Sequence, residues 1–341
     1  MSNSESDNSK CRIIVDAMGG DYAPQNAVIG AVDVFNNYKD LNIFLIGRSH
    51  EIQNVLSKNH LDFPSNNIIH TEEVIDMGET PTVAIKTKLK SSIVVGCSWV
   101  KEKKADAFVS AGNTGAMMTA STLIMGRIPG VGRPTIGAEI PNTFGVCYLY
   151  DVGAGKDAKA IHLLEYAIMG SIYAREMGGV KNPTVGILSM GEEEGKGNEV
   201  ANEAFHLLKK SKLNFIGNVE GRDILTKNVD VIVCDGFVGN ILLKFGESVP
   251  KLLKHLLKKT ADQSLFDKIK IGLFKSTLKK SLKELDYQEQ GGVPLLGVNG
   301  ISMIGHGSST PRAIKNMILK AGEMYRRNLI SKIESSINTT N

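Results

Sequence analysis

The sequence predicts an α/β protein: a three-layer α/β/α sandwich with a mostly parallel sheet and one projecting helical segment. Three observations carry this prediction. Short apolar strand-like runs alternate with amphipathic helical stretches, glycine-rich turns follow several of these runs, and a lysine-rich stretch has helical periodicity with no strand in it. Of the 341 residues, 42% are hydrophobic and 22% are charged, which is enough apolar material for one large core or two smaller ones.

The alternation of strand-like and helix-like segments is the first observation. The predicted strands are Arg12–Val15, Asn42–Ile46, Asn67–Ile69, Ala107–Val109, Thr135–Glu139, Val146–Tyr150, Thr184–Ser189, Asn214–Gly217, Asp230–Cys234 and Ile301–Ile304. Amphipathic helices are predicted between them, for example at Asn26–Asn37, Thr82–Lys90, Ala158–Met177, Glu199–Ser211 and Ser309–Arg327. This order is typical of βαβ units, in which ligands bind at the carboxyl ends of the strands.

Residues 11–330 are predicted to form this single catalytic domain, flanked by disordered tails at residues 1–10 and 331–341. The first ten residues are polar and lack the apolar region of a signal peptide, and no apolar stretch approaches the roughly 18 residues that a spanning helix needs. The cysteines are far apart and have no metal-type spacing: Cys11, Cys97, Cys147 and Cys234. Cys97, Cys147 and Cys234 lie in apolar runs, so we expect their thiols to be buried, and we expect no metal site and a cytoplasmic protein.

The first two glycine-rich turns follow the first and fourth predicted strands. In Asp16–Asp21, adjacent glycines free backbone N–H groups to face an anion at a helix N-terminus. In Ser110–Gly115, Asn113 or Thr114 could cap the next helix and leave amide donors aimed outward. A tight connection and a simple cap remain open as alternatives. The spacing matches neither GxGxxG nor GxxxxGK[ST], which argues against a dinucleotide site or a P-loop.

The third, fourth and fifth turns have a similar composition and are Asp151–Asp157, Gly191–Glu199 and Asp235–Asn240. Asp151 ends a strand, where it could bind a ligand or cap the turn. Lys196 lies between two glycines, where its ammonium could meet phosphate as a point charge or remain a solvated surface charge. Asp235–Asn240 offers a side-chain amide near a helix start, as a donor or a cap, and His306 lies in a glycine-rich loop that could be catalytic or structural. The five strand-end turns together predict one wide, polar, anion-tolerant crevice.

Seven motifs, in order and over about 300 residues, resemble the phosphate acyltransferases of bacterial phospholipid synthesis, the PlsX family. They are DAMGGD at Asp16–Asp21, SAGNTGA at Ser110–Ala116, LYDVGA at Leu149–Ala154, GKGNE at Gly195–Glu199, IGNVEGRD at Ile216–Asp223, DGFVGN at Asp235–Asn240 and GHGSS at Gly305–Ser309. The resemblance implies transfer of a fatty acyl group from acyl carrier protein to inorganic phosphate, without a cofactor. It also implies a homodimer with a fold like that of phosphotransacetylases and isocitrate dehydrogenases.

The resemblance places Lys196 and Asn240 at the reacting centre, Lys196 neutralising phosphate and Asn240 donating to the oxyanion or to phosphate. The substrate and phosphate site that it implies comprises Asp16, Gly19, Gly20, Asp21, Asn113, Thr114, Gly115, Asp151, Gly236 and His306. The family often has Asn near Gly155 and Pro near Ala160, and this departure leaves only a backbone role expected for Gly155. The sequence has no GxSxG, HExxH or Cys–His arrangement, which favours direct attack by phosphate over a covalent acyl-enzyme.

The lysine-rich stretch is the third observation. Lys251–Leu285 carries ten lysines and three acidic residues, a net charge of +7, which leaves −3 for the rest of a chain whose net charge is +4. Such a local charge makes general nucleic-acid binding a poor explanation. Large apolar residues crowd among these lysines, and the resemblance favours contact with an anionic membrane through Leu265, Phe266, Ile269, Leu273 and Phe274. A core- or dimer-facing helix and docking of an acidic carrier protein remain open.

Two other functions compete with acyl transfer. A nicotinamide-dependent decarboxylating dehydrogenase of related fold would need carboxylates for a divalent metal, and Glu192–Glu194 is the one candidate run. A non-catalytic membrane scaffold would be favoured if the turn residues tolerated substitution.

Overall fold

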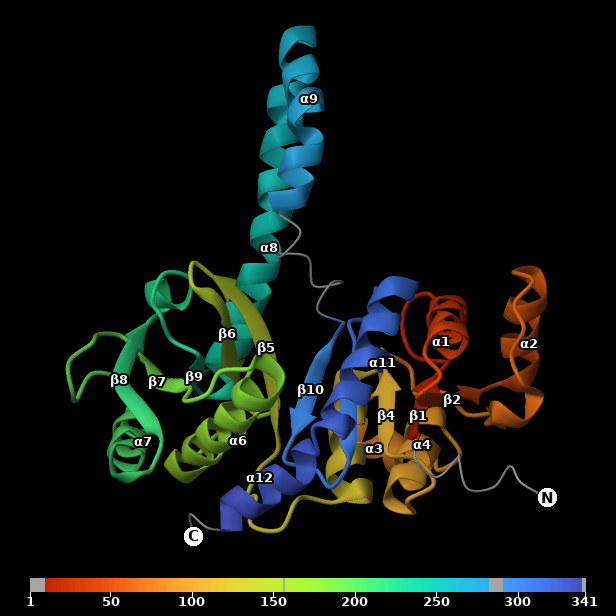
Figure 1. Cartoon of the computed structure of the whole chain (residues 1–341), viewed down its shortest axis with the longest axis horizontal. Coiled ribbons are helices and arrows are strands. Elements are labelled where there is room, and N and C mark those ends of the chain that lie inside the picture. The colour runs from red at the N-terminus through yellow and green to blue at the C-terminus, as the bar shows by residue number, and fades with distance from the viewer. Residues whose placement is uncertain (1–9, 156, 282–290, 339–341) are drawn as a thin grey trace.

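The computed structural model describes residues 10–155, 157–281 and 291–338. It has a single 11-stranded sheet with helices on both faces, and a helical pair projects away from the body (Figure 1). The predicted three-layer α/β fold is therefore confirmed. Apart from Lys10, the predicted N-terminal tail lies outside the described residues.

All ten predicted strands form, together with one that was not predicted. The strands are β1 (Cys11–Asp16), β2 (Leu41–Gly47), β3 (Ile68–His70), β4 (Ala107–Ser110), β5 (Thr135–Asn142), β6 (Gly145–Tyr150), β7 (Thr184–Ser189), β8 (Asn214–Glu220), β9 (Val231–Val233), β10 (Val293–Leu296) and β11 (Ile301–Ile304). Their order across the sheet is β3-β2-β1-β4-β11-β10-β5-β6-β9-β7-β8. Strand β10 contains Pro294, and proline is unusual within a sheet because it lacks a ladder donor.

The strand direction reverses in the middle of the sheet. Strands β3, β2, β1, β4 and β11 are mutually parallel, and so are β6, β9, β7 and β8. Between these groups, β10 is antiparallel to both β11 and β5, and β5 is antiparallel to β6. The two parallel groups therefore run in opposite directions, and the carboxyl ends of their strands do not share one edge.

Each face of the sheet carries its own hydrophobic core. Along β1, Ile13 and Val15 pack into one cluster, while Ile14 between them packs into the other, as the two-residue period of a strand requires. The first face is covered by α1 (Gln25–Asn37), α2 (Ser49–Lys58), α6 (Ala160–Gly178), α7 (Glu199–Lys210), α11 (Pro311–Arg326) and α12 (Leu329–Asn338). The second face is covered by α3 (Pro81–Thr87), α4 (Ser92–Lys101), α5 (Thr114–Ala120) and the first turns of α8 (Gly236–Ala261).

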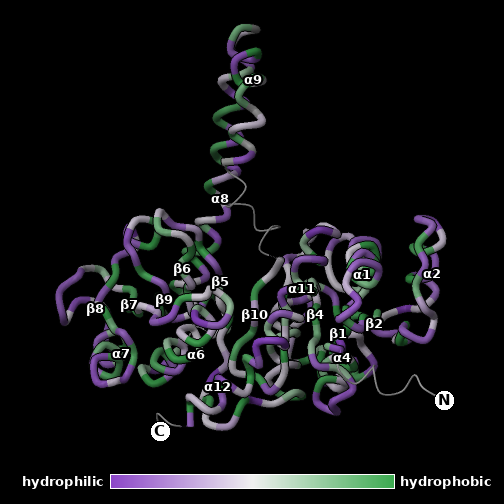
Figure 2. The backbone as a smooth tube through the Cα atoms, viewed as in Figure 1, coloured by the Kyte–Doolittle hydropathy of each residue, from purple (hydrophilic) through white to green (hydrophobic). Residues whose placement is uncertain are grey.

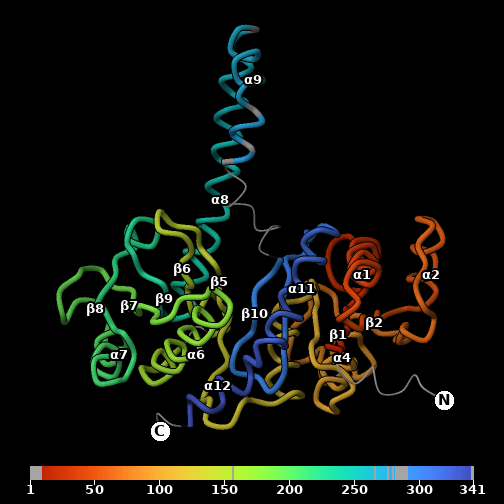
Figure 3. The backbone as a smooth tube through the Cα atoms, viewed as in Figure 1, coloured from red at the N-terminus to blue at the C-terminus, as the bar shows by residue number. Residues whose placement is uncertain are grey.

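The two strand groups form two lobes that meet along a seam formed by the β10–β5 pair and by packing of α12 on α6. Figure 3 shows the blue C-terminal elements β10 and α11 among the red and orange N-terminal ones, so both ends of the chain build the same lobe. Across the seam, β10 pairs with β5 at only two positions. The Lys320 ammonium of α11 lies 2.8 Å from the Glu139 carboxylate of β5, which also accepts the Tyr173 hydroxyl of α6 at 3.1 Å.

The projecting segment is a hairpin of α8 and α9 (Leu265–Ser281), in which hydrophobic and hydrophilic residues are interleaved (Figure 2). The segment predicted at about residues 250–285 is thus two helices, the first of which starts earlier, at Gly236. Residues 282–285 lie outside the described residues.

The prediction of a disordered tail from residue 331 is wrong. Helix α12 extends to Asn338 and buries Leu329, Ile333 and Ile337. These residues recur every four positions, so one face of a helix can enter the core. Residues 339–341 lie outside the described part of the chain.

Candidate active site

Two buried aspartates organise the glycine-rich turns, one in each lobe. Asp16, at the end of β1, is 2% exposed and accepts hydrogen bonds from the Ser110 hydroxyl at 2.6 Å and the Met18 amide at 3.0 Å. Burial raises the pKa of this carboxyl group, although hydrogen bonds from Ser110 and from turn amides oppose the shift. Asp16 therefore holds the first turn against the second and has no exposed surface to offer a ligand.

Asp151 plays the same part at the end of β6. Its carboxylate is fully buried and accepts backbone N–H groups from Ile136 and Gly153 at 3.2 Å, and from Ala154 and Gly155 at 2.9 Å. Burial raises the pKa of this group as well. These amide donors are used inside the turn, so they do not face an external anion as the glycine-rich composition suggested.

The first two turns and the His306 loop lie together in the lobe that contains β1 and β4. A Cβ built on Gly19 would lie 2.6 Å from the Gly112 nitrogen, so these two glycines permit the close approach of the turns. The Asp21 amide donates to the Gly307 carbonyl at 2.7 Å. Gly20 has a positive φ of 103°, which favours glycine. His306 is exposed, and its Nδ1 contacts the Ser308 hydroxyl at 2.7 Å.

Asn113 has a structural role in this lobe. Its Oδ1 accepts the Ala116 amide at 3.0 Å and so caps α5, the alternative that the sequence left open. Its Nδ2 is within 3.2 Å of three backbone carbonyls in residues 76–79. Thr114 is exposed at the helix start, and Gly115 packs against Pro81.

The third and fifth turns lie together in the other lobe. The Gly236 amide at the start of α8 donates to the Gly155 carbonyl at 3.0 Å, and Asp235 caps the helix. Asn240, one turn later, lies over the third turn, because a Cβ built on Gly153 would be 3.6 Å from its amide oxygen. Within the described chain, the Asn240 side-chain amide makes no hydrogen bond.

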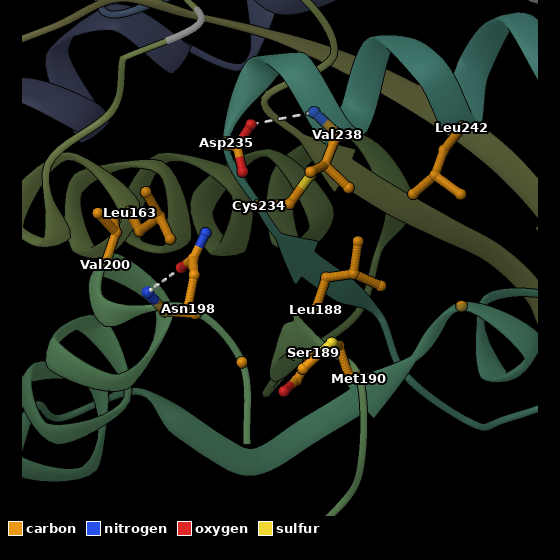
Figure 4. A pocket seen from close by; sticks show the side chains of 13 residues that line it. Leu163, Leu188, Ser189, Met190, Asn198, Val200, Cys234, Asp235, Val238 and Leu242 are labelled. Carbon is orange, nitrogen blue, oxygen red and sulfur yellow. Dashed lines mark hydrogen bonds between the residues drawn. The ribbon is translucent and has the colours of Figure 1, made fainter. Parts of the chain in front are cut away.

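A pocket of about 370 Å³ lies between the fourth turn, the end of β7 and the start of α8 (Figure 4). Its lining is mainly apolar. The Ser189 hydroxyl at the end of β7 is buried and has no hydrogen-bond partner among the described residues. Asn198 caps α7 through its Oδ1, which accepts the Ala201 amide at 2.9 Å. Neither residue was predicted, although Ser189 ends a predicted strand and Asn198 belongs to the GKGNE motif.

Neither Lys196 nor Asn240 lines this pocket. Lys196 is exposed, makes no ion pair with any described residue, and precedes Gly197, which lines the pocket. Val238 and Leu242 line the pocket from α8, whereas Asn240, two residues from each, points about 200° away around the helix. The pocket therefore does not bring together the two side chains predicted at one reacting centre.

A second pocket, of about 250 Å³, lies where the two lobes meet. Met118 and Thr119 of α5 line it, with Leu123 of the π-helix Ser121–Met125. The opposite lobe contributes Arg133 and Ala154, the latter from the third turn. The prediction of one crevice shared by all five turns is wrong, because the strand direction reverses between the two lobes. At this second pocket, the third turn meets α5, the helix that follows the second turn.

The cysteines and the acidic run have no catalytic geometry. All four thiols are buried, and burial raises the pKa of Cys11, Cys97 and Cys147 to about 12. Glu192 pairs with Lys227 at 3.0 Å, and Glu194 pairs with Lys209 at 2.8 Å. In the ranges that the structure describes, no three His, Cys, Asp or Glu residues are grouped to hold a metal ion.

Comparison with known proteins adds the chemical context. A family model described as "Fatty acid synthesis protein" matches residues 11–332. A curated phosphate acyltransferase of Pelotomaculum thermopropionicum is 47% identical over 326 residues, covering 96% of this chain and 95% of the relative.

Two solved structures share the fold at low sequence identity. A phosphotransacetylase from Streptococcus pyogenes has a TM-score of 0.62 and 19% identity, covering 93% of this chain and 94% of that one. A putative 4-hydroxythreonine-4-phosphate dehydrogenase from Salmonella typhimurium has a TM-score of 0.50 and 11% identity, covering 92% of this chain and 99% of that one. These likenesses show the fold alone, because the two proteins named have different activities.

Proposed function

The chain belongs to the phosphate acyltransferases, the PlsX family, and from this premise we propose that it transfers a fatty acyl group from acyl carrier protein to inorganic phosphate. The near full-length identity of 47% to a curated phosphate acyltransferase is the observation that carries the proposal. The product is an acyl phosphate for phospholipid synthesis.

The reaction needs positioning and charge stabilisation more than a protein nucleophile. A phosphate oxygen attacks the thioester carbonyl carbon, a C–O bond forms, and collapse of the tetrahedral intermediate breaks the C–S bond. The carrier thiolate leaves and takes up a proton. Binding both substrates in one orientation and stabilising the oxyanion are the main sources of rate. The burial of all four cysteines supports direct attack rather than an acyl-cysteine intermediate.

The motif resemblance leads us to assign the reacting centre to Lys196 and Asn240, which requires the exposed Lys196 side chain to extend toward Asn240 when substrate is bound, because the pocket in Figure 4 is lined by neither residue. Lys196 neutralises the phosphate, and Asn240 donates to the oxyanion or to phosphate. Two observations support these roles: the Lys196 ammonium is exposed and has no acidic partner among the described residues, and the Asn240 amide has no structural hydrogen bond there. The glycine-rich turns support the site through their backbone shape, since Asp16 and Asp151 use many of their amides.

The competing dehydrogenase has less support. Its metal would need the carboxylates of Glu192–Glu194, but Glu192 and Glu194 form surface ion pairs with lysines. The dehydrogenase of similar fold is only 11% identical.

The proposed reaction is tested with purified protein, acyl carrier protein thioester and inorganic phosphate, with no nicotinamide cofactor. We expect release of the carrier thiol that depends on phosphate, with one acyl phosphate formed for each thiol. Thiol release that is independent of phosphate, or nicotinamide reduction by a hydroxy acid, would contradict the proposal.

The α8–α9 hairpin is the proposed membrane contact of a cytoplasmic, peripherally bound enzyme. Phe266, Ile269, Leu273 and Phe274 are 62–75% exposed, and the Lys270 ammonium lies 4.2 Å from the centre of the Phe266 ring. The side chain of Leu265 lies outside those described. In the described part of the chain, no helix combines the length and apolarity needed to cross a membrane. Apolar side chains beside lysines are typical of contact with an anionic lipid surface.

We expect Phe266→Glu/Phe274→Glu to lose most binding to anionic vesicles in a flotation assay, because carboxylates replace the inserted rings and are repelled by the lipid headgroups. Leu89→Glu is the matched control, since Leu89 is 63% exposed on the body of the protein. Equal flotation of the double variant and the control would remove the hairpin from the membrane contact.

We propose that a second copy of the chain contacts the N-terminal half of α8. Phe237, Ile241 and Phe245 are 52–69% exposed and recur every four residues, which places them on one helix face. Phe144, in the turn between β5 and β6, is 63% exposed. We expect light scattering to give twice the 36.9 kDa chain mass, and Ile241→Glu/Phe245→Glu to shift the protein to the single-chain mass; an unchanged dimer would exclude this face.

A further inference from the structure

Arg133, just before β5, is half-buried, and among the described residues its guanidinium has no acidic partner. Its Nη1 donates to the Asp157 backbone carbonyl at 2.8 Å, and in the described part of the chain no carboxylate oxygen lies within 4.0 Å of the guanidinium. Other partly buried cations are paired: Lys320 with Glu139 at 2.8 Å and Arg12 with Asp106 at 2.8 Å. An unpaired cation that has lost part of its hydration is costly, so this geometry favours an external anion.

The surroundings of Arg133 are suited to such an anion. The guanidinium borders the 250 Å³ pocket at the lobe junction, whose lining includes Met118, Leu123 and Leu295. Apolar walls lower the local dielectric and so strengthen a charge-assisted hydrogen bond. Thr122 adds a hydroxyl to the lining.

The third turn connects Arg133 to the proposed reacting centre. A Cβ built on Gly155 would overlap the guanidinium, so the absence of a side chain there lets Arg133 lie on the turn. Asn240 lies against Gly153 of the same turn. Because the amides of Gly153 and Gly155 donate to Asp151, positive charge at this turn has to come from a side chain.

We propose that Arg133 binds a phosphate group at the acyl-transfer site, in the pocket between the lobes. The guanidinium presents paired N–H donors that match two phosphate oxygens, which an ammonium does not reproduce. The phosphate is the inorganic substrate or a phosphate ester carried by the acyl donor. This assignment rests on the proposed function and adds a substrate-binding residue to it.

Steady-state kinetics with Arg133→Met, Arg133→Lys and the matched surface control Arg175→Met test the proposal. We expect Arg133→Met to raise KM for inorganic phosphate about 10- to 100-fold, the range for loss of a charge-assisted contact. Arg133→Lys restores only part of the affinity, and the control leaves it unchanged. Gly155→Ala retains the arginine but displaces it, and so raises the same KM without loss of charge.

The two phosphate sources give different results. If Arg133 binds the phosphate ester of the acyl donor, Arg133→Met raises KM for the carrier-bound thioester and leaves KM unchanged for a thioester that lacks a phosphate ester. An unchanged KM for both substrates in all Arg133 variants would overturn the proposal.

A binding measurement separates this inference from the proposed function. Inorganic phosphate should raise the melting temperature of the wild type, and should do so less in Arg133→Met, even if no acyl transfer is found. If the wild type shows no acyl transfer but binds phosphate in a way that depends on Arg133, only the proposed function is refuted. If the wild type transfers the acyl group, phosphate raises the melting temperatures of wild type and Arg133→Met equally, and KM for both substrates is unchanged, only the role of Arg133 is refuted.

Discussion

Lys196→Ala and Asn240→Ala are each expected to lower turnover about 100- to 1,000-fold, the usual loss when one preorganised oxyanion-type donor is removed. Lys196 lacks an acidic partner in the described structure, and the Asn240 amide lacks a structural hydrogen bond there. Neither substitution removes a described contact that holds the fold together. The loss should therefore appear in kcat, with a melting temperature close to that of the wild type.

Lys210→Ala is the matched control, because Lys210 is an exposed lysine at the end of α7. The double variant Lys196→Ala/Asn240→Ala tests whether the two side chains act together in catalysis. If the two groups stabilise one transition state as a unit, the double variant loses little more than either single variant. Near-normal turnover in both folded single variants would remove these residues from the reacting centre.

Asp151→Ala is expected to destabilise the protein by about 3–5 kcal/mol, because each buried N–H left without a partner costs about 1–3 kcal/mol. Four backbone donors lose their acceptor together, and the start of α8 packs on the same turn. Urea unfolding followed by circular dichroism measures this loss.

Asp151→Asn distinguishes the hydrogen bonds from the charge. The Asp151 Oδ1 accepts three of the N–H groups, and Oδ2 accepts only that of Gly155. An amide oxygen in place of Oδ1 retains those three acceptor contacts, so the loss should be clearly smaller than for alanine. Asp157→Ala is the control, an exposed carboxylate of the same turn, and should change stability by less than about 0.5 kcal/mol. Equal stability of Asp151→Ala and wild type would refute the organising role.

The sequence predicted local elements better than their direction in the sheet. Periodicity located all ten predicted strands because each is a short apolar run beside a turn. It missed β10, in which Pro294 argues against a strand. Strand direction depends on long-range pairing, and no local sequence feature marks the antiparallel pairing of β10 and β5. The similar composition of the five turns therefore wrongly indicated one shared crevice.

For a similar reason, the sequence could not predict whether the backbone N–H donors of a turn face a ligand or the aspartate of the same turn. An aspartate followed by small residues has the same sequence pattern whether its carboxylate faces a ligand or folds back on its own turn. Burial decides between the two, and Asp16 and Asp151 are at most 2% exposed. Arg133 gave no motif, because its position against Gly155 depends on the meeting of two lobes. The placement of α12 could have been found, since Leu329, Ile333 and Ile337 have helical spacing.

The narrow pairing of β10 with β5 has a mechanical consequence. Main-chain bonds join the two halves of the sheet at only two positions, and the halves are also held by packing of α12 on α6 and by the Lys332–Glu176 ion pair at 2.6 Å. Twisting of one half against the other must therefore disturb the α12–α6 packing as well as the two-position ladder, so we expect its amplitude to be small. Such twisting would change the width of the junction that contains Arg133 while leaving the interior of each half intact.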